Sequence, residues 1–176
     1  MPRPFVLTTA ATTYSWAWAF TSSEILARDL NMENIYSAQG SNVPQGKAEI
    51  RILDAEIEFD GTQGMGTSIP GPAHLLASSL AACLLKNVER FHHRLPFEYT
   101  KATAHVELER QDAPPKIILA RFLLEIETDE NPQRCALLHK NVRKYGTITN
   151  TLSACCTIEG TLRAVRTNGT TEDFHA

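Results

Sequence analysis

The chain has 176 residues, which is enough for one domain with a sizeable core, and a formal net charge of −3 with no concentration of basic residues for nucleic acid. No run of about 18 apolar residues exists, so we expect no membrane-spanning helix, and the N-terminal stretch is too poor in basic residues for a secretion signal. Four cysteines make no disulfide framework, so we expect a cytoplasmic protein.

Residues 1–45 form an N-terminal extension whose role the sequence leaves open. Aromatic and small residues alternate over 12–20 and predict a strand, and residues 22–32 fit a short helix. Residues 37–46 are rich in turn formers and predict a loop. We expect the extension to cover apolar surface of the domain or of a partner subunit.

The strongest helix pattern runs from Pro72 to Pro96. Proline suits the first helical position, and a second proline marks the end. The first half is apolar nearly all round, with small residues between leucines, which predicts a helix buried on all sides. Before it, alternation over 47–59 predicts two strands or one bent strand, and residues 61–71 form a glycine-rich loop, either a pocket rim or a linker.

Apolar and polar residues alternate clearly in the strands that follow the central helix. Residues 99–110 and 116–128 predict two long strands joined by a hairpin loop, and Asn131-Pro132 starts a helix over 133–144. A short helix over 148–154, a last strand over 157–165 and a loose polar tail over 167–176 complete the chain. This order of strands and helices along the chain predicts an α+β domain over 46–166, with an antiparallel sheet wrapped around the central helix.

Cys83 lies in the middle of the central helix, about three turns from Pro72. The helix dipole fades within the first turn, so a reactive thiol there needs a cation or donor from another segment. Packing as a small apolar side chain is the alternative.

The pattern Pro-x-x-Leu-Leu-x-x-Ser-Leu-Ala-x-Cys, from Pro72 to Cys83, resembles the central-helix motif of the OsmC/Ohr family of osmotically induced and organic-hydroperoxide-resistance proteins. The order of the following elements is also similar, and the resemblance covers about residues 46 to 166. It implies an OsmC-like fold and an intertwined homodimer in which two central helices lie back to back.

The resemblance also implies a thiol peroxidase. In the family, a cysteine at the position of Cys83 attacks a hydroperoxide as the thiolate, a second cysteine resolves the sulfenic acid, and an arginine and a glutamate assist. Gly146 stands at the position of the second cysteine and Ala73 at that of the glutamate, so the chain is a divergent member. Arg51 is a weak candidate for the arginine, and His74 lies near the expected pocket rim.

Three further cysteines could replace the missing one: Cys135 on the preceding helix, and Cys155 and Cys156 after the short helix. If the adjacent pair lies on a strand, its side chains point to opposite faces, so at most one could face Cys83. Packing is the alternative for all three. No Cys-x-x-Cys or His-x-x-x-His spacing indicates a metal site, and we expect no cofactor.

Two functions remain open from the sequence. The first is a thiol-dependent peroxidase that reduces organic hydroperoxides through Cys83 and is recycled by an external thiol reductant or an atypical cysteine. The second is a catalytically degenerate dimer that binds a small hydrophobic molecule near Cys83. We expect a homodimer in both cases, with no nucleic acid or membrane partner.

Overall fold

The computed structural model describes residues 35–44, 47–62 and 68–175. The chain divides into two compact units, residues 1–38 and 39–176. The strand and helix predicted over 12–20 and 22–32 lie outside the described residues. The second unit holds two sheets and three described helices, which confirms the predicted α+β class.

The smaller sheet has three antiparallel strands in the order β1 (Gln39–Asn42), β2 (Ala48–Ile52) and β3 (Ala55–Phe59). Residues 47–59 therefore form two strands. The predicted loop over 37–46 is wrong in part, because β1 lies within it. The β1 residues are small and polar, and their pairing with β2 rests on backbone groups rather than on an apolar pattern.

This sheet has one apolar and one charged face. On the apolar face Ala48 pairs with Phe59 and Ile50 with Ile57. Successive side chains of a strand point to opposite faces, so the charged residues share the other side: Glu49, Arg51, Glu56 and Glu58.

The larger sheet has the strand order β4 (Lys101–Asp112), β5 (Pro115–Glu127), β6 (Thr157–Val165) and β7 (Thr171–His175). The predicted all-antiparallel arrangement is wrong at one pair, since β5 and β6 are parallel. The chain between them crosses over through two helices, as a parallel connection requires. The predicted loose tail also differs, because β7 pairs with β6 in antiparallel register.

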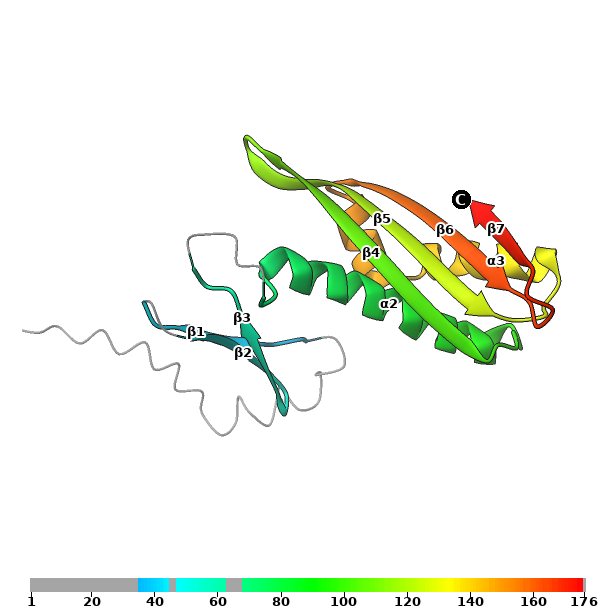
Figure 1. The fold of residues 1–176 in the computed structure, drawn as a ribbon, viewed down its shortest axis with the longest axis horizontal. Coiled ribbons are helices and arrows are strands. Elements are labelled where there is room, and N and C mark those ends of the chain that lie inside the picture. Colours follow the sequence, from blue (N-terminus) through cyan, green and yellow to red (C-terminus); the bar gives the residue numbers. More distant parts are fainter. Residues whose placement is uncertain (1–34, 45–46, 63–67, 176) are drawn as a thin grey trace, which may run out of the picture. The chain divides into compact units, whose positions relative to one another are not determined.

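Three helices lie on one face of this sheet (Figure 1): α2 (Pro72–Arg94), α3 (Pro132–Lys144) and α4 (Thr147–Ser153). Asn131 caps α3 as predicted, with its side-chain oxygen accepting the Arg134 N–H at 3.0 Å. The core between helices and sheet is apolar. Its fully buried members include Leu80, Leu84, Val88, Leu124, Ile126, Leu138, Val142 and Leu162.

Helix α2 begins at Pro72 as predicted and ends at Arg94, and within a single chain it is not buried on all sides. Its buried residues form one stripe, Leu80, Leu84, Asn87, Val88 and Phe91. Several small residues of α2 are exposed: Ala73, Ser78, Ser79 and Ala82. Among the residues that the structure describes, no helix combines the length and apolar character needed to cross a membrane.

Candidate functional site

Cys83 lies midway along α2, one residue before the buried Leu84, and its side chain is half-buried. It thus sits at the border between the stripe that packs on the core and the exposed face of small residues. A thiol at such a border is shielded on one side and reachable on the other.

Asn87 is the polar partner of Cys83, which the sequence analysis missed. Its amide Nδ2 donates to the Cys83 carbonyl oxygen at 2.9 Å and lies 3.7 Å from the Cys83 sulfur. Asn87 is only 6% exposed, although its neighbours in the stripe are apolar. A polar residue one helical turn after the cysteine, at a position where the pattern calls for leucine, is the signal that could have found it.

The resemblance implies an arginine beside Cys83, and the described residues supply no arginine or lysine hydrogen bond to its sulfur. Arg51 forms an ion pair with Glu56 on the charged face of the small sheet, and both side chains are well exposed.

His74 has a structural role at the start of α2. Its Nδ1 accepts the backbone N–H of Gly71 at 3.1 Å, which satisfies the N–H of the N-cap residue by one half of a capping-box pattern. The ring is exposed. The structure therefore accounts for His74 by helix capping.

Gly146, where the resemblance implies the second cysteine, lies at the start of α4, and a side chain there would meet close neighbours. A Cβ atom there would lie 2.6 Å from Thr149 Oγ1 and 3.2 Å from the Val142 carbonyl oxygen. The Gly146 φ is −80°, so the backbone does not require glycine and the constraint is space. Thr149 is 5% exposed, and its Oγ1 has no hydrogen-bond partner among the described residues.

Cys135 is buried in the core on α3. Its thiol donates to the Glu130 carbonyl oxygen at 3.6 Å. Burial raises the pKa of the Cys135 thiol, against an opposing effect of the nearby Arg166 guanidinium. These features fit the packing alternative better than a resolving role.

Cys155 and Cys156 lie in the turn between α4 and β6, not on a strand. Both thiols donate to the Leu152 carbonyl oxygen, at 3.2 and 3.3 Å. The expectation that the two side chains point to opposite faces is therefore wrong, because that rule holds only for extended backbone. Burial and the neighbouring Cys155 raise the pKa of Cys156.

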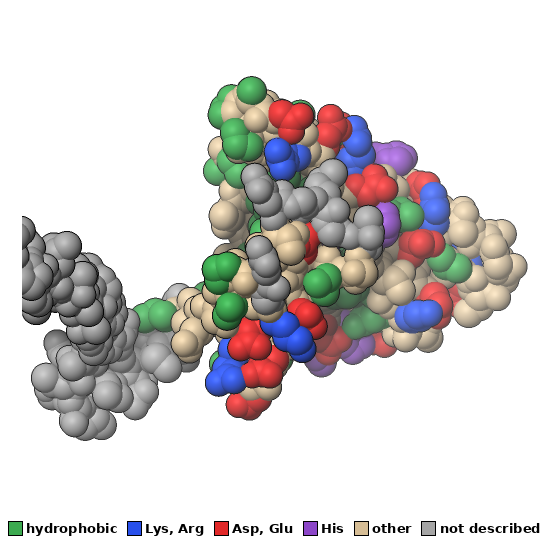
Figure 2. All heavy atoms as spheres, turned by 60° about the vertical axis from the view of Figure 1, so that its left-hand side comes forward, with side chains coloured by type: hydrophobic (Ala, Val, Ile, Leu, Met, Phe, Trp, Pro, Cys, Tyr) green, Lys and Arg blue, Asp and Glu red, His purple; other side chains and the backbone are tan. Residues whose placement is uncertain are grey.

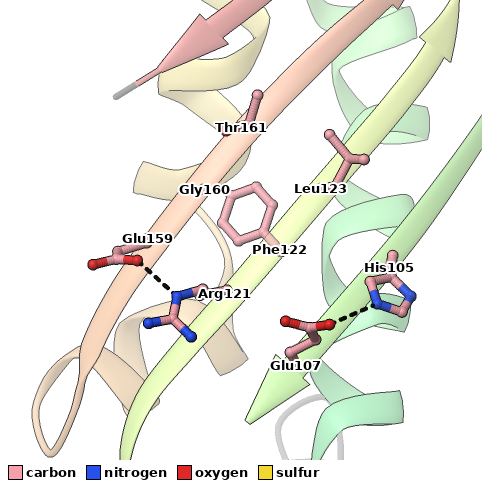
Figure 3. A pocket seen from close by; sticks show the side chains of 8 residues that line it. All are labelled: His105, Glu107, Arg121, Phe122, Leu123, Glu159, Gly160 and Thr161. Atoms are coloured by element: carbon pink, nitrogen blue, oxygen red, sulfur yellow. Dashed lines mark hydrogen bonds and ion pairs between the residues drawn. The ribbon is translucent and has the colours of Figure 1, made fainter. Parts of the chain in front are cut away.

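Two cavities on the larger sheet and its helices are lined by described residues other than Cys83. One of about 250 Å³ lies across β4, β5 and β6, where His105 contacts Glu107 and Arg121 contacts Glu159 (Figure 3). It includes the Phe122 ring beside Gly160. Another, of about 340 Å³, is lined by the basic residues Lys140, Arg143 and Lys144 with Thr149, Asn150, Ser153 and Ile158.

A metal centre finds no support in the part of the chain that the structure describes, because it contains no group of three or more His, Cys, Asp or Glu side chains placed to hold an ion. His93 instead contacts Glu89 at 3.0 Å.

The chain matches the family model described as OsmC-like protein over residues 48–160. The chain belongs to the OsmC-like family. The match includes α2 with Cys83, the strands of the larger sheet up to Gly160, and both later helices. No curated protein matches the chain in sequence.

Solved structures of OsmC-like proteins share this fold. The OsmC-like protein of Mycoplasma pneumoniae aligns with a TM-score of 0.66 at 19% identity, covering 74% of this chain and 99% of the other. The organic hydroperoxide resistance protein OhrB of Bacillus subtilis aligns with a TM-score of 0.55 at 13% identity, covering 73% and 97%. At these identities the likeness establishes the OsmC-like fold, which the sequence motif had predicted.

Proposed function

We propose that this OsmC-like protein reduces organic hydroperoxides through Cys83 and is recycled by an external thiol. The observation that supports this most directly is the half-buried thiol on α2 with the Asn87 amide at its sulfur. Two structural relatives are organic hydroperoxide resistance proteins by name, from Bacillus subtilis and Elizabethkingia anophelis. Four free cysteines suit a reducing compartment such as the cytoplasm.

The proposed reaction has three steps. The Cys83 thiolate attacks one peroxide oxygen, the O–O bond breaks, and the other oxygen leaves as an alcohol after taking a proton, so that Cys83 becomes a sulfenic acid. An external thiol then attacks the sulfenic sulfur, which releases water and forms a mixed disulfide. A second external thiol displaces Cys83, which returns as a thiol. The peroxide gains two electrons, and the two external thiols lose them.

The state of the other cysteines supports an external reductant. Gly146 has no thiol and no space for one, and Cys135 is fully buried with its own carbonyl acceptor. Cys155 and Cys156 both contact the Leu152 carbonyl oxygen. None of these three thiols is hydrogen-bonded to Cys83 within the described part of one chain.

The active unit in this proposal is a homodimer. The exposed small residues of α2 would allow close approach of a second α2, and the apolar face of the small sheet would pack on the partner chain. Large apolar side chains are exposed at the end of β2 and in the turn after it, Ile52 at 41% and Leu53 at 89%. The surface view shows separate apolar patches among charged side chains (Figure 2). A cation for Cys83 would then come from the partner.

The test is peroxide consumption by the purified chain with dithiothreitol, using cumene hydroperoxide and hydrogen peroxide. We expect turnover that prefers the organic peroxide and falls by about 100-fold or more in Cys83→Ser, since serine is a far weaker nucleophile at neutral pH. Cys155→Ser is the matched control, because it removes an exposed thiol elsewhere and should retain turnover. Absence of turnover in the unchanged protein, or turnover that survives Cys83→Ser, contradicts the proposal.

The second candidate is a degenerate dimer that binds a small hydrophobic molecule near Cys83. Two observations favour it: a side chain at Gly146 would meet Thr149 and the Val142 carbonyl oxygen, and no described lysine or arginine hydrogen-bonds to the Cys83 sulfur. A protein that shows no peroxide turnover but takes up an apolar dye, with Cys83→Phe abolishing the uptake, would support this candidate.

A further inference from the structure

We infer that Cys155 and Cys156 form a two-sulfur chelating site for a thiophilic centre, such as trivalent arsenic that carries one organic group. The inference is independent of the chemistry proposed for Cys83. It rests on the arrangement of two adjacent thiols in the turn between α4 and β6.

The two sulfur atoms converge on one point. Both lie within 3.3 Å of the Leu152 carbonyl oxygen, so the two side chains are on the same side of the turn. Adjacent cysteines on a strand would instead point to opposite faces. The turn thus brings together two donors that can act on a single atom.

The Leu152 carbonyl oxygen, which both thiols contact, already accepts two backbone hydrogen bonds. Leu152 O also accepts the backbone N–H groups of Cys155 and Cys156, both at 2.9 Å. A carbonyl oxygen has two lone pairs, and a thiol is a weak donor. The two backbone bonds therefore satisfy the oxygen, and the thiols lose little when they exchange this contact for another ligand.

The thiols can be reached from solvent. Cys155 is exposed and Cys156 is half-buried. Cys135, in contrast, is completely buried, and its burial makes it unsuitable for a bulky reagent. The accessible pair also differs from Cys83, which is a single thiol on its helix.

The geometry favours chelation over a disulfide between the two cysteines. Their Cα atoms are neighbours in the chain, about 3.8 Å apart across a trans peptide. Ordinary disulfides span Cα distances of about 4.4 to 6.8 Å, so a bond between adjacent cysteines is strained and easily reduced. A larger atom that bridges the two sulfurs avoids this strain, and soft centres prefer sulfur ligands.

The binding step needs no oxidant. With an organic arsenic(III) oxide, the two S–H bonds and the arsenic–oxygen double bond break. Two arsenic–sulfur bonds and the two O–H bonds of water form in their place. The two thiol protons leave with the oxygen as water. Arsenic remains trivalent and no sulfur is oxidised.

The experiment titrates the reduced full-length chain with phenylarsine oxide under argon. Bound arsenical is counted by native mass spectrometry, and accessible thiols are counted with Ellman's reagent. We expect one arsenical per chain and the loss of two thiols, with an apparent Kd at least 100-fold weaker in Cys155→Ser and in Cys156→Ser. A small dithiol should reverse the binding, whereas mercaptoethanol at equal thiol concentration should not. Cys83→Ser is the matched control and should bind as the unchanged chain does.

Three outcomes would overturn the inference. The first is binding in Cys155→Ser that equals that of the unchanged chain, and the second is the loss of only one thiol. The third is loss of binding in Cys83→Ser, which would show that the arsenical bridges to that thiol instead. Thermal unfolding of each variant checks that it is folded. If Cys156→Ser does not fold, Cys155→Ser decides alone, because its side chain is exposed. Peroxide turnover is measured separately, so its failure would leave this result unaffected.

Discussion

At the scale of single residues, buried polar groups without partners stand out. His139 on α3 is 1% exposed, packs against the Phe122 ring with 5.9 Å between ring centroids, and has no described hydrogen-bond partner for its Nε2. Burial, followed by the positive charges of Arg143 and His175, lowers the pKa of His139 to about 4. The native state thus holds this ring neutral.

The consequence is a loss of stability in mild acid. Between pH 6.5 and about 4 the unfolded chain binds a proton at this histidine and the native state does not, so the free energy of unfolding falls as pH falls. The expected loss from His139 is at most about 3 kcal/mol. Urea unfolding at pH 7 and pH 4.5 should show a smaller pH dependence in His139→Leu. The variant His105→Leu, at an exposed position, should show the same change in the free energy of unfolding between the two pH values as the unchanged chain. An equal change in all three proteins would contradict the prediction.

At the scale of elements, α3 and α4 pack closely at their junction because residue 146 is a glycine and has no side chain. Thr149 Oγ1 lies within 2.6 Å of the place where a Cβ of residue 146 would be. The short helix therefore packs more closely on the end of α3 than a cysteine at that position would permit. Thr149 thus occupies the space that a cysteine side chain at residue 146 would need.

We predict that Gly146→Cys does not restore an internal resolving thiol. The added side chain meets Thr149 and the Val142 carbonyl oxygen, so the variant should lose about 1–3 kcal/mol of stability. Gly146→Cys combined with Thr149→Ala should recover part of this loss, which thermal unfolding can measure. A Gly146→Cys variant as stable as the parent, with a disulfide to Cys83 by mass spectrometry, would show that the junction opens easily.

At the scale of the whole molecule, the half-buried apolar face of the small sheet and the exposed side of α2 are the two surfaces that matter for assembly. The apolar pairs on β2 and β3 are typical of a sheet face that packs on something. We proposed a second copy of the chain as the occupant. A substitution on the charged face of the same sheet can serve as the control for one on the apolar face.

We predict that Ile50→Glu weakens the dimer, because it places a charge in the middle of the apolar face. Light scattering after size-exclusion chromatography should show twice the chain mass for the unchanged protein and a shift toward the monomer mass for this variant. Glu49→Gln, on the opposite face of the same strand, should remain dimeric. A monomeric parent protein would overturn the dimer proposal, as would an Ile50→Glu variant with unchanged mass.

The sequence predicted the elements whose signals are local. Helix α2 begins at Pro72 and β6 spans Thr157–Val165 as expected, and Asn131 caps α3. Periodicity and capping depend on a few neighbouring residues, so the chain carries them directly. The family motif on α2 likewise predicted the OsmC-like fold.

What depended on distant contacts was decided only by the tertiary structure. The pattern of β5 and β6 does not state that they pair in parallel, since strand direction follows from the path of the intervening helices. Three features of the thiols and their surroundings depend on side-chain positions that local patterns do not specify. They are the contact of Asn87 with Cys83, the close neighbours of Gly146, and the convergence of Cys155 and Cys156 on Leu152. The sequence by itself determined which residues could react and which elements carry them. Packing decided which of them meet, because it joins parts of the chain that no local pattern connects.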